Sequence, residues 1–302
     1  MNDQKIEGVQ NVKFSLIVGT LNRAVELDNC LKSLQKQEYT NYEIIIIDQS
    51  ENDETEKLIK SKSQEMIKYY HVSYKGLSRA RNDGLKKAKG DYICLIDDDA
   101  FYRKDFLSTA VKSLDDRTVL SGYIYDTIKK GAFVKYNVDN NYKKLSLRSI
   151  IRTCPSAGLV IPMRMIKDVG GFDEQLGVGS DYPSGEETDL LLRGLRRGYT
   201  VVFIKDLILK HPYPIPDCSI QNYNANEKRA LYYKGLGALF KKHLFINKMH
   251  GLLVCYLEVW IKLLIKKILF FKYGSKQIKK QMACLKEGVK RYLPVKEVDR
   301  DE

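Results

Sequence analysis

The 302-residue sequence lacks several patterns that mark common classes of protein. Its six cysteines stand at least 29 residues apart, without a Cys-x-x-Cys pair or a neighbouring Cys/His cluster, which argues against a zinc site and a disulfide scaffold. The N-terminal MNDQKIEGVQ lacks the basic and apolar regions of a signal peptide, and no charge-free apolar run approaches the ~18 residues of a membrane span. We therefore expect a reduced chain whose active parts face the cytoplasm.

Glycine and proline are also scarce, with 20 and 7 residues, which excludes collagen-like and low-complexity chains. Hydrophobic residues make up 44% of the chain and charged residues 29%, as in ordinary globular proteins. The length indicates two domains or one large one, at ~150 residues per domain.

Short apolar runs alternate with amphipathic segments over residues 13–99, which is the pattern of βαβ units and a largely parallel sheet. Between the apolar runs, residues such as Ala24, Leu27 and Leu31 recur at helical spacing. Ligands of such sheets bind beyond the carboxyl ends of the strands, so the loops after the strands are the expected place for a site. The expected strands are KFSLIVG (13–19), YEIIIID (42–48), IKYYHVSY (67–74) and DYICLID (91–97).

These loops contain neither G-x-G-x-x-G nor G-x-x-x-x-G-K-[ST], which argues against a dinucleotide dehydrogenase and a P-loop NTPase. They contain carboxylates instead, because Asp48 ends the second expected strand and residues 97–99 form an Asp triplet at the end of the fourth. Alternate strand residues point the same way, so Asp97 and Asp99 are expected on one side and Asp98 on the other. Two such oxygen donors suit Mg²⁺ or Mn²⁺ bridging a diphosphate. A solvated acidic turn is the alternative, but three adjacent acids repel one another without a cation, which favours the metal.

The motifs in these segments resemble the donor-binding half of a family 2 glycosyltransferase with the GT-A fold. The matching stretches are GTLNR (19–23), SLQKQEY (33–39), YEIIIIDQS (42–50) and GLSRARNDGLKKAKGDYICLIDDD (76–99). A second block, GLVIPMRMIKDVGGFDE (158–174) and GEETDLLLRGLRRGY (185–199), resembles the acceptor half of the same family.

The resemblance implies an α/β fold with a mostly parallel central sheet flanked by helices. Its catalytic domain would occupy residues 1–240, with the donor half at about 13–99 and the acceptor half at 100–240. Residues 241–302 would form a C-terminal helical, basic amphipathic extension.

The resemblance also implies roles for residues around a nucleotide-diphosphate donor. Asp48 would contact the base, and Arg81 would lie near the diphosphate or the sugar, since an Arg fork matches phosphate oxygens. From spacing alone, Arg79 and Arg81 fit a solvated helix face as well. The loop after the second strand reads DQSEND, where the family often has a DDGS-like turn. The implied donor-binding residues are Thr20, Asn22, Arg23, Asp48, Arg81, Asp97 and Asp98.

The implied metal ligands are Asp99, Asp97 and His211, with Mn²⁺ or Mg²⁺ as the ion. His211 follows the strand-like TVVFIKDLIL, at the place where many GT-A enzymes put a late His on the metal or the diphosphate. The alternative is that this lone His before Pro is a turn residue.

The reaction implied is inverting transfer of the sugar to a hydroxyl, a single displacement that needs one general base. The candidates are Glu186, Glu187 and Asp189. The family usually has Glu-Asp here and uses the second acid, which indicates Glu187, and Glu186 stays open as an alternative. The stretch from Ser184 to Glu187 also fits a helix capping box, in which these acids would only stabilise a helix N-terminus.

The C-terminal fifth of the chain carries most of the excess positive charge. Of a formal net charge of +13, residues 241–302 contribute 15 Lys/Arg against 6 Asp/Glu. Within them, the apolar stretch Gly251–Phe271 is interrupted by Glu258 and by lysines, so it does not suit a bilayer span and is typical of an interfacial helix on anionic lipid. A helix packed on the catalytic domain or on a second copy is the alternative.

These features together predict a glycosyltransferase that uses a UDP- or dTDP-sugar and a saccharide acceptor linked to a lipid. It would act in bacterial surface-polysaccharide synthesis, as a peripheral protein on the inner face of the cell membrane. A catalytically impaired, nucleotide-sugar-binding partner subunit is the alternative. Nucleic acid is not expected as a partner, because the basic tail is interleaved with aliphatic residues and few stacking aromatics.

Overall fold

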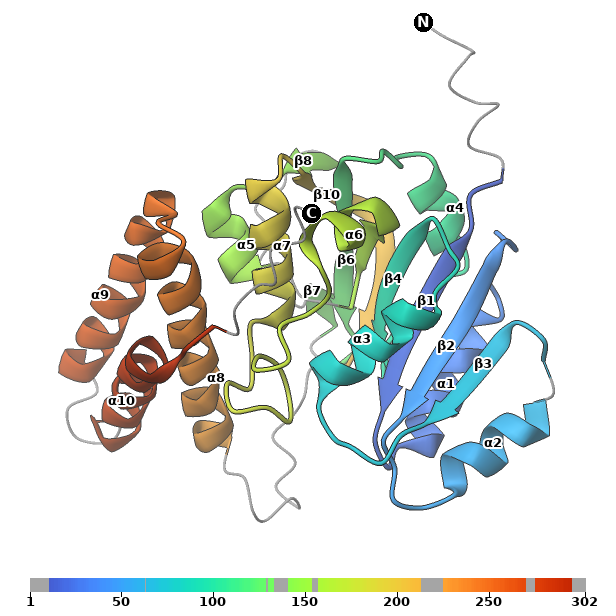
Figure 1. The fold of residues 1–302 in the computed structure, drawn as a ribbon, viewed down its shortest axis with the longest axis horizontal. Coiled ribbons are helices and arrows are strands. Elements are labelled where there is room, and N and C mark those ends of the chain that lie inside the picture. Colours follow the sequence, from blue (N-terminus) through green and yellow to red (C-terminus); the bar gives the residue numbers. More distant parts are fainter. Residues whose placement is uncertain are drawn as a thin grey trace, which may run out of the picture. The chain divides into compact units, whose positions relative to one another are not determined.

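The computed structural model describes residues 11–62, 64–128, 130–132, 141–153, 157–212, 225–269 and 275–294 (Figure 1). Its chain forms two compact units. Unit 1 comprises Met1–Phe172 and Leu190–Ile215, and unit 2 comprises Asp173–Asp189 and Pro216–Glu302. Two of the six cysteines, Cys154 and Cys218, and Phe271 at the end of the apolar stretch lie outside the described residues.

A mixed sheet forms the centre of unit 1, and within the described residues it has ten strands in the order β3-β2-β1-β4-β9-β6-β10-β5, with β7 beside β6 and β8 beside β10. The first four strands are parallel neighbours, whereas β9 runs antiparallel to β4 and β6. The strands are β1 (Phe14–Thr20), β2 (Tyr42–Asp48), β3 (Ile67–His71), β4 (Tyr92–Asp97), β5 (Phe101–Tyr102), β6 (Thr118–Asp126), β7 (Gly131–Ala132), β8 (Tyr142–Lys144), β9 (Leu159–Pro162) and β10 (Thr200–His211).

The helices of this part of the chain flank the sheet (Figure 1). In α1, Leu27, Cys30, Leu31 and Leu34 are buried in one core cluster with β1, β2 and β4, as the helical spacing predicts. On α3, Gly84 permits close packing, since a Cβ there would lie 2.5 Å from Ile17 Cγ2 of β1. The helices are α1 (Ala24–Leu34), α2 (Glu54–Lys62), α3 (Leu77–Lys87), α4 (Phe106–Val111), α5 (Leu147–Thr153), α6 (Met163–Val169) and α7 (Glu186–Arg196).

The four strands expected from the sequence are confirmed, and so is their parallel pairing. Their register places Thr20 beside Asp48 and Gly19 beside Asp97. The carboxyl ends of β1, β2 and β4 therefore end at one edge of the sheet, which brings the loops after these strands together.

Unit 2 is built mainly from helices: α8 (Ala225–Phe240), the π-helix η3 (Lys241–Ile246), the 3₁₀ turn η4 (His250–Leu252), α9 (Leu253–Leu269) and α10 (Ser275–Arg291). Helices α8 and α10 cross with their backbones in contact at Gly237 and Gly288. A Cβ on Gly288 would lie 2.1 Å from the Lys234 carbonyl oxygen, so this crossing requires glycine.

The compact units differ from the domain boundary expected at residue 240. Helix α8 ends at Phe240 and η3 begins at the next residue, so no linker separates them. The segment 173–189, which the sequence places in the acceptor half, belongs to the same unit as these helices. Its Ser184 hydroxyl donates to the Tyr232 carbonyl of α8 at 3.0 Å, and a Cβ on Gly235 would lie 2.5 Å from the Ser184 carbonyl oxygen.

Candidate active site

Three consecutive acids at the end of β4 form the centre of the candidate site in unit 1. Asp98 is buried and accepts from Thr20 Oγ1 at 2.8 Å and from Arg23 at 2.7 Å. The second guanidinium NH₂ of Arg23 donates to Asp99 Oδ2 at 2.7 Å. Burial, with the neighbouring Asp97 and Asp99 charges, raises the pKa of Asp98 to about 7 against the opposing effect of Arg23.

His211, the last residue of β10, lies against the other two acids. Its Nε2 is 3.1 Å from Asp99 Oδ1 and 3.6 Å from Asp97 Oδ2. Burial alone would lower the pKa of His211, but its hydrogen bonds and charge interactions with the two carboxylates raise that pKa to about 10. In turn, His211 and Arg23 hold the pKa of Asp99 well below its ordinary value, although burial opposes them. A protonated imidazole therefore joins Asp97 and Asp99 at neutral pH.

Arg81, on α3, contacts this cluster through Asp97. Its side chain is only 2% exposed, its NH2 donates to Asp97 Oδ1 at 3.1 Å, and its guanidinium lies 5.6 Å from the centre of the Phe172 ring. The solvated-face alternative is therefore wrong for Arg81, whereas Arg79 is exposed and covers the Tyr74 ring.

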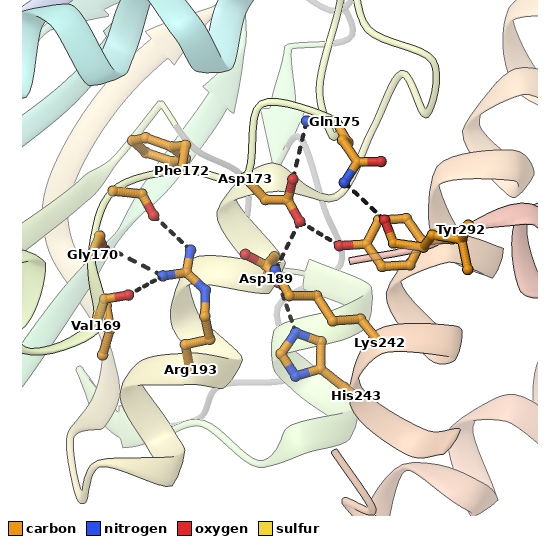
Figure 2. Close-up of polar contacts among 12 residues, drawn as sticks. Val169, Gly170, Phe172, Asp173, Gln175, Asp189, Arg193, Lys242, His243 and Tyr292 are labelled. Atoms are coloured by element: carbon orange, nitrogen blue, oxygen red, sulfur yellow. Dashed lines mark hydrogen bonds and ion pairs between the residues drawn. The ribbon is translucent and has the colours of Figure 1, made fainter. Parts of the chain in front are cut away.

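The Phe172 backbone is fixed by the side chain of Asn82, which accepts from Phe172 N at 2.6 Å and donates to Phe172 O at 2.9 Å. The preceding turn is fixed by Arg193 of α7, which donates to the carbonyls of Val169 at 2.5 Å and Gly171 at 2.7 Å (Figure 2). Asn82 and Arg193 therefore position the ring that lies against Arg81.

Asn22 joins the loops after β1 and β2, and Asp48 fixes the second of these loops. Asp48 is fully buried; its Oδ1 accepts from Ser50 N and Oγ at 2.9 and 2.5 Å, and its Oδ2 accepts from Tyr69 OH at 2.8 Å. Asn22, in the left-handed region at φ 54°, donates its N–H to Ser50 Oγ at 2.8 Å and accepts from Glu51 N at 3.1 Å. Asp48 thus fixes the loop after β2, where the sequence predicts contact with the nucleotide base.

Gln49 is a residue that the sequence reasoning passed over. It follows Asp48 directly and is 7% exposed, and no described residue donates to its Oε1. A buried amide oxygen without a donor is costly, so it marks a position where a ligand N–H could bind. The signal available in the sequence was a polar residue directly after the acid that ends a central strand.

The candidate bases lie at the start of α7, in unit 2. Gly185 precedes the helix at φ +91°, and Glu186 is buried while Glu187 is half-buried. Asp189 is fully buried, and its Oδ1 lies 2.8 Å from both Lys242 Nζ and His243 Nε2 (Figure 2). The Asp189 carboxylate therefore has a structural role, and Glu186 and Glu187 are left as the candidates for the general base.

The anchor extends to the other end of the segment 173–189. Lys242 Nζ also lies 2.8 Å from Asp173 Oδ2, which in addition accepts from the Tyr292 hydroxyl (Figure 2). We name Asp173, Asp189, Lys242, His243 and Tyr292 the buried cluster. No local sequence pattern indicates these pairs, because their members are 53 or more residues apart.

Substituting Asp189 by asparagine should destabilise the protein by about 3 kcal/mol, because removal of one partner of a buried ion pair leaves the Lys242 ammonium without full compensation. Chemical unfolding would measure the loss. Asp181→Asn, an exposed acid of the same segment, serves as the control and should change stability by less than about 0.5 kcal/mol. Equal stability of the two variants would contradict the anchoring role.

No group of three or more His, Cys, Asp and Glu side chains within the described ranges is arranged as a ready metal site. Asp97, Asp99 and His211 nevertheless present two carboxylate oxygens and one ring nitrogen close together. Carboxylate and imidazole are ligands that Mn²⁺ accepts, and coordination through Nε2 would require the neutral form of His211.

Solved structures with the GT-A fold align with this chain. S. aureus TarS 1-349 in complex with UDP-GlcNAc aligns with a TM-score of 0.60 at 17% identity, over 92% of this chain and 81% of that one. Mannosyltransferase PcManGT from Pyrobaculum calidifontis, in complex with GDP-Man and Mn²⁺, aligns with a TM-score of 0.63 at 15% identity, over 92% of this chain and 87% of that one. The fold of this chain is therefore of the GT-A type.

The sequence identifies the family. The model of glycosyl transferase family 2 matches residues 15–168, just over half of the chain. The protein belongs to this family, as its motifs predict.

Curated relatives include an uncharacterized glycosyltransferase of Rickettsia conorii, 30% identical over 152 residues, or 49% of this chain and 25% of that protein. Another is the GalNAc(5)-diNAcBac-PP-undecaprenol beta-1,3-glucosyltransferase of Campylobacter jejuni, 34% identical over 108 residues, or 34% of this chain and 35% of that protein. The alignments thus span about a quarter to a third of the length of these relatives.

Proposed function

We propose that the protein transfers a sugar from a nucleotide-diphosphate donor to a hydroxyl of a saccharide acceptor, with inversion at the sugar carbon. The observation that carries this proposal is the convergence of Arg23, Arg81 and His211 on the Asp97–Asp99 triplet at the carboxyl edge of the sheet. Cations and carboxylates gathered there suit a diphosphate and its counter-ion. Two solved structures with this fold, the complexes with UDP-GlcNAc and with GDP-Man, support the donor class.

The nucleoside would lie over the loops after β1 and β2, with Thr20, Asn22 and Arg23 along it. Asp48, held by Ser50 and Tyr69, would contact the base together with Gln49. The Gln49 amide oxygen would accept the imide N–H of uracil or thymine, which supports a UDP- or dTDP-sugar. In this proposal Asp98 fixes Arg23 and Thr20, whose other hydrogen-bonding groups meet the donor.

We further propose Mn²⁺ or Mg²⁺ as the cofactor, held by Asp97, Asp99 and His211. When bound, the ion would neutralise charge on the departing diphosphate. Arg81 holds Asp97 Oδ1, so the other oxygen of this carboxylate is the one directed at His211. The chain itself thus orients both carboxylates before the donor arrives.

Glu187 is our proposed general base, with Glu186 as the second candidate. An inverting displacement needs one carboxylate to take the proton of the attacking hydroxyl. The buried cluster, by fixing Asp189 two residues further along α7, would hold Glu187 in place for this step. No covalent intermediate is required.

The acceptor is proposed to be linked to a lipid, and the protein to act in surface-polysaccharide synthesis at the inner face of the cell membrane. The Campylobacter relative, named as a glucosyltransferase for a saccharide linked to undecaprenol, supports this acceptor class. The alternative is a partner subunit that binds a nucleotide sugar without turning it over.

Incubation with UDP-, dTDP- and GDP-sugars tests the proposal. In Mn²⁺, one donor at about 100 times its Kd should stabilise the fold by ~2.7 kcal/mol and should release nucleoside diphosphate slowly by hydrolysis. EDTA should remove both effects. Stabilisation without release, even with lipid-linked acceptors from a bacterial extract, would favour the partner subunit, and no stabilisation by any donor would contradict the proposal.

A further inference from the structure

Helix α9 carries an apolar stripe on its solvent-exposed side. Its members follow one another at intervals of three, four or one residues, so they share one face of the helix. Between 46% and 74% of each side chain is exposed. We name these residues the α9 stripe: Val254, Leu257, Ile261, Leu264, Ile265 and Ile268.

The stripe is not the face with which α9 packs in unit 2. That packing uses Leu263 and Cys255, which are buried, and Trp260, which lies 5.6 Å from the Lys286 ammonium of α10. Trp260 thus faces α10. α9 therefore has an inner packing face and a second, outer apolar face, whereas an ordinary surface helix is polar outside.

Lysines flank the stripe on both margins, and Glu258 is the one acid of α9. On α9, Lys262 is exposed and Lys267 half-buried, and at 100° per residue they fall on opposite margins of the stripe. Over the described residues from 241 to 294 there are 12 Lys/Arg and 2 Asp/Glu. A second copy of the chain would bring two such basic surfaces together, and this repulsion argues against self-association through the stripe.

We propose that the α9 stripe is a docking surface for a bilayer that contains anionic phospholipid. The apolar side chains would enter the boundary between headgroups and acyl chains, while the lysines meet lipid phosphates. In the described part of the chain, none of the helices is long and apolar enough to cross a membrane. The inference rests on the membrane localisation proposed above and assigns the surface that would serve it. It is separate from the proposed reaction, since binding to lipid requires neither donor nor turnover.

Co-sedimentation of the full chain with vesicles tests this surface. We expect binding to vesicles of phosphatidylcholine with 30% phosphatidylglycerol, and binding at least tenfold weaker to pure phosphatidylcholine or at high salt. The double variant Ile261→Ser/Ile265→Ser should bind the anionic vesicles at least tenfold more weakly, because it removes apolar area without changing charge. Leu293→Ser, at an exposed apolar residue outside α9, is the matched control and should stay within about threefold of the unmodified chain.

Circular dichroism and thermal unfolding show whether both variants keep the fold, as expected for exposed positions. If the unmodified chain leaves the vesicles in solution, or the double variant sediments as well as the control, the inference is overturned. It is also overturned if the chain is a dimer in analytical ultracentrifugation that the double variant converts to a monomer, since the stripe would then bind a second copy. Donor binding measured on the same samples reports separately on the proposed function.

Discussion

Glu187→Gln should lower the rate of sugar transfer at least ~100-fold and leave the Kd for the donor within about threefold. Glutamine has nearly the same size and keeps a hydrogen-bonding oxygen, but it cannot take a proton at neutral pH, so only the proton-transfer step is lost. Radiolabelled transfer under donor saturation measures kcat, and calorimetry measures the donor Kd.

Glu186→Gln is the matched comparison, because the two acids are adjacent at the start of the same helix. We expect it to retain at least a third of the transfer rate. If instead Glu186→Gln loses transfer and Glu187→Gln keeps it, the base is Glu186. If Glu187→Gln only lowers the melting temperature and turnover stays normal, these acids stabilise the helix N-terminus and the assignment of the base is wrong.

The second large effect concerns the metal. Asp99→Asn should weaken binding of a nucleoside diphosphate in Mn²⁺ at least ~30-fold, to the level that the unmodified chain shows in EDTA. The substitution replaces a charged oxygen donor by a neutral amide, which is a poor ligand for a hard cation beside a diphosphate. The amide oxygen still accepts from Arg23, so the fold should persist.

Asp116→Asn is the control for this experiment, since Asp116 is an exposed acid paired with Arg164. Its nucleotide affinity should be unchanged in both Mn²⁺ and EDTA. Equal affinity of the unmodified chain with and without Mn²⁺, or an Asp99→Asn chain that retains the Mn²⁺ effect, would contradict the metal assignment.

The sequence was sufficient to predict the donor half of the fold. Its four strands are runs of β-branched and aromatic residues bounded by polar loops, and the parallel order places Asp48 and Asp97 at one edge. Local patterns also indicated that Asp97 and Asp99 face one way, and both lie near His211 while Asp98 meets Thr20 and Arg23.

Contacts between distant residues could not be predicted. Lys242 and His243 lie on a π-helix, which residue propensities do not predict. In the sequence, their partner Asp189 has the position of an ordinary acid in the first turn of a helix. The sharp change of composition after residue 240 suggested a domain boundary there. Composition depends on solvent exposure and charge, whereas α8 and α10 belong to one unit because their backbones pack at Gly237 and Gly288.

The buried cluster also determines the effect of truncating the chain after residue 240. Lys242, His243 and Tyr292 all follow residue 240, and the two carboxylates that they contact precede it. A protein shortened at this point would retain Asp173 and Asp189 without these partners. The C-terminal helices are thus needed for folding of the segment that carries Glu186 and Glu187. We expect that they cannot be deleted without loss of this segment's structure.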